Sequence, residues 1–338
     1  MSSHSSRKIL VTGGAGFIGS HAVRKLLQRG HRVEIVDDLS HGHRATVPDR
    51  VPFHQIDVRN TGALEKLLEG SGFDTVLHFA AWISVEESVL KPDLFRDNNL
   101  GGTRSLLRAM RKAGVHELVF SSTAAVYGEP SEMPINENTP TAPVNPYGQA
   151  KLDAEQAIKE WAEGESDNRF AVLRYFNVAG ASADGDLGEV HEPETHLVPN
   201  VLRAALPESP PITLFGDDYP TPDGTCVRDY IHVEDLVDAH AHVLERLEAG
   251  DGRTYNLGIG KGFSIREVLN AAKAVTGRSI PYVMGPRRTG DVAELRADPA
   301  KIARELGWRA QHTELAPMIE SAWNFLRSHP RGYAPSSD

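Results

Sequence analysis

A glycine-rich turn near the start of the chain limits the possible folds more than any other feature. An apolar run at residues 8–12 has the pattern of a strand, and Gly13-Gly-Ala-Gly-Phe-Ile-Gly19 leads from it into a helical pattern at 17–28. Glycines here permit positive φ, let a pyrophosphate approach the backbone, and let the helix pack closely on the strand. The free N–H groups at the start of the helix bind phosphate. We therefore predict a dinucleotide-binding turn that uses Gly13, Gly16 and Gly19.

Strand and helix patterns alternate through the first half of the chain, which is typical of parallel strands joined by crossover helices. We predict strands at 8–12, 32–36, 52–56, 74–79, 115–121 and 170–176, and helices at 17–28, 62–69, 93–112 and 146–161. Together these elements predict an α/β fold with a doubly wound parallel sheet of the Rossmann type.

The pattern changes after residue 177. Residues 178–222 are rich in Gly, Pro, Asp and His, with only a short helix predicted at 197–206 and a strand at 212–215. A strand at 227–232, a helix at 233–247 and a strand at 255–257 are predicted to return to the first sheet, and helices at 264–275, 299–306 and 314–327 to complete a smaller domain. We predict a dinucleotide-binding domain of residues 1–177 plus about 227–260, and a second, smaller substrate-binding domain of residues 178–226 plus about 261–330.

Composition excludes several classes of protein. The formal charge is −10 and no basic block is present, so nothing indicates binding to nucleic acid or to an anionic membrane. No apolar run reaches the roughly 18 residues of a membrane span, and the start of the chain lacks the apolar core of a signal peptide. Cys226 is the only cysteine, and no cluster of His and carboxylate residues shows metal-ligand spacing. We therefore expect a cytosolic protein without a disulfide or a bound metal.

Acidic residues at the ends of strands indicate which dinucleotide is bound. Asp37 follows the second predicted strand, where a carboxylate accepts hydrogen bonds from the adenosine ribose hydroxyls and repels a 2′-phosphate. The expected cofactor is therefore NAD and not NADP. Asp38 either shares this role or is a solvated loop carboxylate. Asp57, after the third strand, either reaches the adenine amino group or caps a helix.

A tyrosine and a lysine form a candidate acid–base pair. Tyr147 and Lys151 are four residues apart on the helix predicted to begin at Pro146, so both side chains lie on one face. A phenol has a pKa near 10, roughly three units above neutral pH, and a nearby ammonium and a positively charged nicotinamide ring both favour the phenolate. Thr123 ends the fifth strand, at the sheet edge where α/β proteins bind ligands, and its hydroxyl can bridge a substrate and Tyr147.

These features are found together in one known family. The chain resembles the extended short-chain dehydrogenase/reductase family and, within it, the UDP-glucose 4-epimerases, over nearly its whole length. The matching stretches are Val11-Thr-Gly-Gly-Ala-Gly-Phe-Ile-Gly19, Phe120-Ser-Ser-Thr-Ala-Ala-Val-Tyr-Gly128, Asn145-Pro-Tyr-Gly-Gln-Ala-Lys151, Arg174-Tyr-Phe-Asn-Val178, Leu306-Gly-Trp308 and, most distinctive, Phe215-Gly-Asp-Asp-Tyr-Pro-Thr-Pro-Asp-Gly-Thr-Cys-Val-Arg-Asp-Tyr-Ile-His-Val233.

The resemblance implies an isomerase that inverts C4 of UDP-glucose or UDP-galactose and never releases its NAD. Tyr147 would take the proton from the sugar 4-hydroxyl while C4 passes hydride to NAD, and the resulting 4-keto sugar would turn and receive the hydride on its other face. Lys151 would bind the nicotinamide ribose and lower the pKa of Tyr147, and Thr123 would hydrogen-bond the reacting oxygen. A homodimer is the common assembly in this family and is expected here.

Positions that match the family add further site residues. Those that would contact NAD are Phe17, Ile18, Asp37, Asp57, Val58, Phe79, Ala80, Ala81, Asn98 and Phe176. Those that would contact the UDP-sugar are Asn177, His196, Leu197, Phe215, Arg228, Arg288 and Asp291. Because arginine is a bidentate phosphate ligand, Arg228 and Arg288 are expected to bind the diphosphate, with surface ion pairs as the alternative. Phe215 either stacks on uracil or packs in the core.

Two other functions fit parts of this pattern. A sugar-nucleotide 4,6-dehydratase shares the glycine turn and the Tyr-Lys pair, but it needs an acid and a base directly after the strand-end Thr, and Ala124 and Ala125 stand there. A non-catalytic NAD-sensing or scaffold protein on this fold commonly lacks the Tyr or the Lys, and this chain has both Tyr147 and Lys151.

The sequence leaves open whether the UDP-sugar is a hexose, an N-acetylhexosamine, a pentose or a uronate. Leu295 falls where related epimerases border the sugar pocket, with Tyr in enzymes confined to glucose and galactose and a small residue in those that admit N-acetyl groups. Because Leu is intermediate in size, we expect UDP-glucose and UDP-galactose to be preferred over their N-acetyl forms. The alternative is that Leu295 packs in the smaller domain and never meets the sugar.

Overall fold

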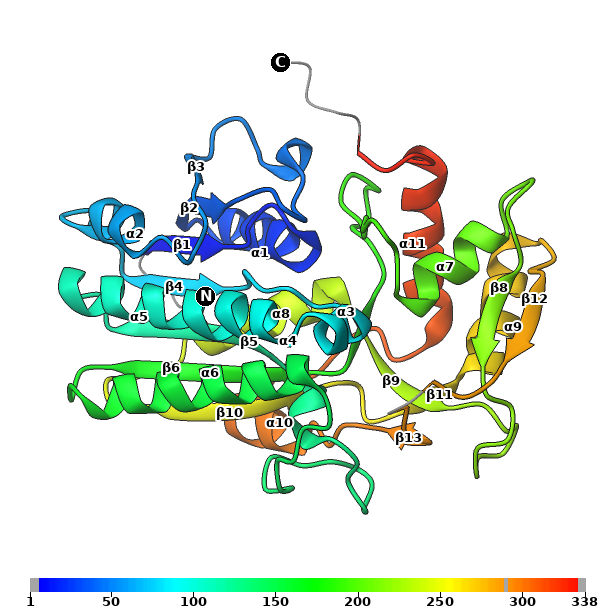
Figure 1. Cartoon of the computed structure of the whole chain (residues 1–338). Coiled ribbons are helices and arrows are strands. Elements are labelled where there is room, and N and C mark those ends of the chain that lie inside the picture. Colours follow the sequence, from blue (N-terminus) through cyan, green and yellow to red (C-terminus); the bar gives the residue numbers. More distant parts are fainter. Residues whose placement is uncertain (1–5, 289–290, 334–338) are drawn as a thin grey trace.

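A parallel sheet of seven strands forms the centre of the computed structural model, which describes residues 6–288 and 291–333 (Figure 1). The strands run in the order β10-β6-β5-β4-β1-β2-β3. They are β1 (Lys8–Thr12), β2 (Arg32–Asp37), β3 (Phe53–Gln55), β4 (Thr75–His78), β5 (Glu117–Thr123), β6 (Arg169–Tyr175) and β10 (Gly252–Leu257). The strand order changes direction between β1 and β4, so the crevice that binds ligands in such sheets is expected there. The predicted doubly wound α/β fold is confirmed.

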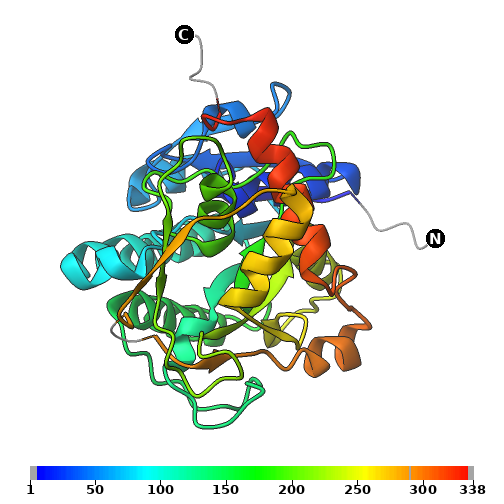
Figure 2. The same ribbon diagram turned by 90° about the vertical axis from the view of Figure 1, so that its right-hand side faces the viewer.

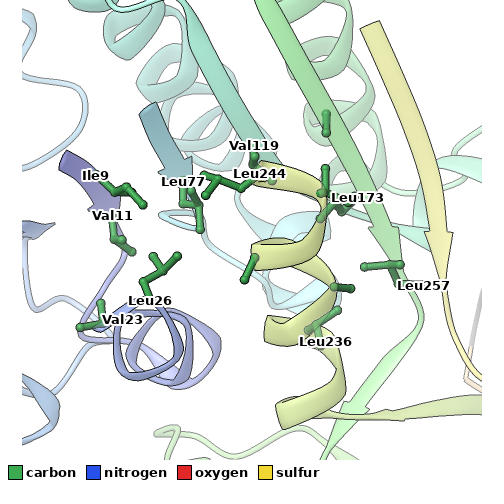
Figure 3. Packing of buried hydrophobic residues seen from close by; sticks show 14 of the residues in the cluster. Ile9, Val11, Val23, Leu26, Leu77, Val119, Leu173, Leu236, Leu244 and Leu257 are labelled. Atoms are coloured by element: carbon green, nitrogen blue, oxygen red, sulfur yellow. The ribbon is translucent and has the colours of Figure 1, made fainter. Parts of the chain in front are cut away.

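Helices cover both faces of this sheet and bury two separate apolar cores (Figure 1). Helices α1 (Phe17–Gln28) and α8 (Val233–Leu244) cover one face, and α2 (Thr61–Leu68), α5 (Gly102–Ala113) and α6 (Pro146–Glu163) cover the other. Figure 3 shows how side chains of α1 and α8 meet those of the strands in the first core. Successive strand residues enter opposite cores because side chains alternate along a strand. The strands are therefore apolar on both faces, as fully covered parallel sheets require.

The predicted helix at 93–112 is interrupted in the structure. It consists of α4 (Pro92–Arg96), a π-helical turn η2 (Asp97–Gly101) and α5. A further short helix, α3 (Val85–Leu90), precedes it and was not predicted. Because π-turns are frequent at functional sites, the position of η2 beside a cleft indicates that this cleft is functional.

A smaller part lies at the carboxyl ends of the central strands (Figure 1). In it, β7 (Asn177–Ala179), β9 (Val227–His232), β11 (Gly262–Ser264) and β13 (Glu294–Leu295) form one sheet, and β8 (Ile212–Phe215) pairs with β12 (Tyr282–Gly285). Its helices are α7 (Leu197–Ala204), α9 (Ile265–Thr276) and α11 (Leu315–Ser328), of which α9 and α11 lie side by side in Figure 2. Short 3₁₀ turns occur at η1 (Arg44–Thr46) and η3 (Ala124–Tyr127).

Two predicted placements are wrong. The strand at 227–232 does not pair with the seven-stranded sheet, because β9 pairs with β7, β11 and β13. The helix at 299–306, observed as α10 (Ala300–Leu306), does not belong to the smaller part, because Ile302 and Leu306 are buried in the core that α1 and α8 share with the sheet. Sequence patterns identified both elements, but they do not show which of two apolar surfaces an element covers.

Within the described residues, no helix has the length and apolar character needed to cross a membrane.

Candidate active site

A cleft of about 1220 Å³ opens between the carboxyl ends of the central strands and the smaller part. Its walls hold every predicted site residue except Asp57. These residues are Gly13, Gly16, Phe17, Ile18, Gly19, Asp37, Asp38, Val58, Phe79, Ala80, Ala81, Asn98, Thr123, Tyr147, Lys151, Phe176, Asn177, His196, Leu197, Phe215, Arg228, Arg288, Asp291 and Leu295. The fold thus brings together residues that lie up to 282 positions apart, from Gly13 to Leu295.

The glycine turn is shaped for close approach of a ligand to its backbone. Gly13 has φ +71°, and a Cβ there would lie 2.5 Å from the backbone N of Ala80 at the end of β4. A Cβ at Gly19 would lie 2.0 Å from the carbonyl oxygen of Gly13. Helix α1 starts after Gly16 without a side-chain cap, so its first N–H groups face the cleft free of a protein side chain. This arrangement fits a pyrophosphate and therefore fits NAD.

Asp37 ends β2 inside the cleft, with 7% of the residue exposed. Its carboxylate accepts hydrogen bonds from the backbone N–H of Ala15, at 3.0 Å, and of Leu39, at 2.9 Å. Burial raises the pKa of Asp37 above its usual range, although the two backbone donors oppose the shift. Asp38 also lines the cleft, where its carboxylate accepts hydrogen bonds from the backbone N–H and the hydroxyl of Ser40.

Asp57 is the predicted residue that the fold leaves outside the cleft walls. Its carboxylate lies 2.6 Å from Nη2 of Arg59, and this ion pair and its hydrogen bonds hold the pKa of Asp57 below its usual range. It does not cap α2 either, since the side chain of Asn60 accepts the capping hydrogen bond from Ala63. The neighbouring Val58 does line the cleft.

Tyr147, Lys151 and Thr123 converge at the end of β5. Asn145 caps α6 by accepting the N–H of Gly148 at 2.8 Å, which places Tyr147 in the first turn of the helix. The Thr123 hydroxyl and the Tyr147 phenol line the same end of the cleft, where Thr123 acts to lower the pKa of Tyr147. One turn later, Nζ of Lys151 donates to the carbonyl oxygen of Ser121 at 2.9 Å and lies 4.9 Å from the centre of the Phe120 ring. The predicted triad is therefore assembled around one end of the cleft.

Burial alone makes Tyr147 a poor base. It raises the pKa of Tyr147 to about 12, although the hydrogen bond with Thr123 acts in the opposite direction. Burial also lowers the pKa of Lys151 to about 7, with the carboxylate of Glu155 opposing the change. To ionise Tyr147 near neutral pH, the site must therefore gain positive charge at its reacting end, as the nicotinamide ring of a bound NAD would provide.

Glu155 is a positioning residue that the sequence analysis missed. It lies one helical turn after Lys151, and its carboxylate accepts from Nε of Arg174 at 2.9 Å, from Nη2 of Arg174 at 2.5 Å and from the Ser122 hydroxyl at 2.5 Å. The side chain of Glu155 is 0% exposed and that of Arg174 is 5% exposed. These contacts attach α6 to β5 and β6 directly below the catalytic pair. An acidic residue at i+4 from Lys151 was the available signal.

The π-turn η2 holds another cleft wall. Asn99 accepts from the backbone N–H of Trp82 at 2.8 Å and donates to its carbonyl at 2.9 Å, so it pairs with the loop after β4 as a backbone strand would. The adjacent Asn98 donates to the Asn99 side chain at 3.0 Å and lines the cleft. Asn98 was predicted from its match to the family, and Asn99 was not predicted. The π-turn that directs both amides inward has no clear sequence signal.

Two arginines converge on one carboxylate in the smaller part. Asp291 lies 3.0 Å from Nε of Arg288 and 3.7 Å from Nη2 of Arg228. The Arg288 guanidinium also lies 5.0 Å from the centre of the Phe215 ring. These groups line the cleft together. The arginines thus form ion pairs with Asp291 and face the cleft at the same time. The two predicted alternatives, diphosphate binding and ion pairing, are therefore compatible.

Leu295 occupies the cleft wall near the sheet. It lies opposite Arg228 in the register of β13 and β9 and packs against a cluster that includes Phe176, Ala124 and Tyr127. Leu295 and Phe176 line the same cleft as Tyr147.

His196 belongs to a compact His/Glu cluster that the sequence analysis missed. Glu189, His191, Glu194 and His196 offer ligand atoms that all lie within 4.8 Å of one another. Burial alone would raise the pKa of Glu189, but the charges of His196 and His191 and the hydrogen bond with His196 hold it at about 2. Burial opposes protonation of His191, whereas the neighbouring carboxylates of Glu189 and Glu194 raise its pKa to about 10. The expectation of no metal-ligand spacing overlooked the available signal, the pattern Glu-x-His-x-x-Glu-x-His at 189–196.

Comparison with known proteins places these features in a family. Residues 9–258 match the model of the NAD dependent epimerase/dehydratase family. A Lactobacillus helveticus protein named UDP-glucose 4-epimerase is 49% identical over 96% of this chain and 99% of its own length. A rice protein named probable UDP-arabinose 4-epimerase 1 is 44% identical over 97% of this chain and 81% of its own length. A solved structure of UDP-glucose 4-epimerase from Bifidobacterium longum, in complex with NAD+ and UDP, has a TM-score of 0.92 and 40% identity over 96% of this chain and all of that one.

The Asp37 variant Asp37→Ala is expected to retain NAD less well and to discriminate less against NADP. Loss of hydrogen bonds to a charged group costs about 1.5–3 kcal/mol, which corresponds to a dissociation constant for NAD that is roughly 10- to 100-fold larger. The nucleotide that copurifies with each protein should be released and quantified by chromatography. The exposed Asp49→Ala variant serves as the control. Wild-type protein that copurifies with NADP would contradict the assignment.

Proposed function

The chain belongs to the NAD dependent epimerase/dehydratase family, and we propose that it interconverts UDP-glucose and UDP-galactose with Tyr147 as the acid–base residue. The enzyme is an isomerase that uses NAD to invert C4 of a UDP-sugar. The single observation that supports the assignment of roles is the convergence of Tyr147, Thr123 and Lys151 at the end of the cleft that the glycine turn opens.

The chemistry of each residue follows from its place. NAD, when bound, accepts hydride from C4 and returns it to the opposite face of the 4-keto sugar. Tyr147 removes the proton of the 4-hydroxyl and later returns it, and Thr123, beside Tyr147 in the cleft, holds the same oxygen. Lys151, anchored on Ser121, adds positive charge beside the phenol and binds the nicotinamide ribose. The pairing of Glu155 with Arg174 keeps Lys151 and Tyr147 on the strand side of α6.

We assign the remaining walls of the cleft to the two ligands. Residues 1–177 and the segment around 233–260, which includes α8 and β10, would carry NAD. The glycine turn, Asp37, Asp38, Val58, Phe79, Ala80, Ala81, Asn98 and Phe176 would contact it. The smaller part would carry the UDP-sugar, with contacts from Asn177, His196, Leu197, Phe215, Arg228, Arg288, Asp291 and Leu295. Asp57, which lies between the cleft residues Ile56 and Val58, would contact the adenine amino group.

The cleft favours epimerisation over the two rival functions. Ala124 and Ala125 line the cleft directly after Thr123, so neither position offers the acid or base that a 4,6-dehydratase needs there. A scaffold protein has no requirement for a lysine buried at the cleft beside a partly buried tyrosine, and burying a lysine without function is costly.

The role of Tyr147 is tested by the Tyr147→Phe variant. Because general acid–base catalysis contributes roughly 10²- to 10⁴-fold, we expect kcat to fall by about 10²-fold or more while NAD stays bound. Conversion of UDP-galactose should be followed by chromatography without added cofactor, and bound NAD by its release. The matched control is Tyr282→Phe, which removes the same hydroxyl from a half-exposed strand outside the cleft. A Tyr147→Phe variant within a few-fold of wild type would exclude Tyr147 from the mechanism.

The preferred sugar is tested at Leu295. A pocket that already fits its sugar must strain to admit an acetamido group, at a cost of roughly 1–3 kcal/mol. We expect UDP-glucose and UDP-galactose to exceed their N-acetyl forms in kcat/KM by about one to two orders of magnitude, and Leu295→Ser to narrow this difference. Val283→Ser, on an exposed position of β12, is the control.

Two outcomes of this assay count against the prediction. Equal kcat/KM for UDP-galactose and UDP-N-acetylgalactosamine in the wild type would overturn the expected preference. An unchanged ratio in Leu295→Ser would remove Leu295 from the sugar pocket. Adding UDP-pentoses and UDP-uronates to the panel tests the remaining substrates.

We also infer that two chains assemble through α3. Val85, Val89 and Leu90 of this helix lie at the rim of the cleft and are exposed at 45%, 61% and 75%. A cluster of exposed apolar side chains marks a contact surface. The wild type is expected to elute as a dimer by size exclusion with light scattering, and Leu90→Asp to shift it toward the monomer. The control, Val283→Asp, places the same charge on β12 and should leave the dimer intact. A monomeric wild type would contradict the inference.

The cytosolic location stays a prediction. The side chain of Cys226 is buried and unbonded to another cysteine, which is compatible with a reducing compartment.

A further inference from the structure

We propose that Glu189, His191, Glu194 and His196 form a zinc-binding site on the wall of the cleft. All four residues come from one segment that connects β7 to α7, in the pattern Glu-x-His-x-x-Glu-x-His. Two imidazoles and two carboxylates are ligands that Zn²⁺ accepts in a tetrahedral site. Neither the reaction proposed above nor its catalytic residues require this metal.

Three separations within the cluster are close to those around a tetrahedral ion. With metal–ligand distances of about 2.0–2.2 Å, two ligand atoms of a tetrahedral site lie about 3.3–3.6 Å apart. Nδ1 of His191 lies 3.3 Å from Glu189 and 3.7 Å from Glu194, and Nδ1 of His196 lies 3.6 Å from Glu194. The fourth separation, 2.5 Å between His196 and Glu189, is that of a shared proton and must lengthen to admit the ion.

One oxygen of a buried carboxylate in the cluster has no hydrogen-bond partner. The side chain of Glu194 is only 1% exposed, and within residues 6–288 and 291–333 its Oε2 has no hydrogen-bond partner. Its Oε1 accepts the backbone N–H groups of Thr195, at 2.9 Å, and of His196, at 3.0 Å. The same Oε1 lies 3.7 Å from Nδ1 of His191 and 3.6 Å from Nδ1 of His196, so the carboxylate stands within the cluster. Leaving the second oxygen unpaired is costly in a buried position, and a bound cation would satisfy it.

Charge balance favours a divalent ion. The carboxylates of Glu189 and Glu194 carry two negative charges, and their side chains are only 6% and 1% exposed. Zn²⁺ with two neutral imidazoles cancels both charges.

The ion would also order the start of α7. His196 precedes Leu197, the first residue of this helix, and its side chain does not cap the helix. Coordination through Nδ1 fixes the ring and leaves the proton on Nε2. Because His196 and Leu197 both line the cleft, a metal would hold this wall in one arrangement. This consequence rests on the proposed function, whereas the binding of zinc does not.

The site is tested by the metal content of the full-length enzyme. The protein is dialysed against EDTA, mixed with one equivalent of Zn²⁺, desalted and measured by plasma mass spectrometry. We expect about one zinc per chain in the wild type, and at least a 10-fold weaker affinity in Glu194→Gln and His191→Ala. The matched control is Glu192→Gln, which changes an exposed glutamate of the same segment and should bind zinc as the wild type does.

A spectroscopic measurement on the unmodified protein keeps the proposal testable if a variant fails to fold. Co²⁺ added to the metal-free wild type should give the visible absorption of a tetrahedral site, and one equivalent of Zn²⁺ should abolish it. Zinc retained equally by Glu192→Gln and Glu194→Gln would overturn the proposal. So would a wild type that retains no zinc and gives no tetrahedral Co²⁺ spectrum, since protons alone would then satisfy the cluster. Because neither measurement uses a UDP-sugar, a failure here leaves the epimerase assignment untouched.

Discussion

The buried ion pair between Glu155 and Arg174 supports the rest of the active site. It joins α6 to β6, while the Ser122 hydroxyl joins the same carboxylate to β5, the strand that ends at Thr123. Breaking a buried pair by removing one partner typically costs about 3–5 kcal/mol, because the other charge is left uncompensated. Since Tyr147, Lys151 and Glu155 follow one another at intervals of four residues, the ion pair fixes both catalytic side chains against the sheet.

Local groups, and not the net charge of the protein, provide the binding sites for the phosphates of NAD and of the UDP-sugar. The protein has a formal charge of −10, yet its cleft holds an uncapped helix start at Gly16 and two arginines held by Asp291. Backbone N–H groups and guanidinium groups act at hydrogen-bond range, where the long-range field of the protein matters little. The two devices lie on opposite walls of the cleft, one on the sheet and the other in the smaller part.

Most of the sheet could be predicted because parallel strands covered on both faces are apolar throughout and are separated by helices of ordinary length. The strand at 227–232 and the helix at 299–306 were identified but misplaced. An apolar strand that follows a loop can pair with the edge of either sheet, and β9 pairs with β7, β11 and β13. The interruption of the helix at 93–112 was missed for a different reason. A π-turn is stabilised by tertiary contacts, here the pairing of Asn99 with Trp82, and not by local helix propensity.

The sequence by itself determined the glycine turn, the spacing of Tyr147 and Lys151, and the acid at the end of the second strand. The glycine turn and the Tyr147–Lys151 spacing depend on residues that are close in the chain. The position of the acid depends on the edge of the sheet at which parallel strands end. Only the tertiary structure decided that Asp57 pairs with Arg59, that Leu295 meets Phe176, and that Glu155 anchors α6. It also decided that two histidines and two glutamates of one irregular segment converge. Such choices depend on which distant surfaces are buried together, and this is a property of the packed chain that no local pattern encodes.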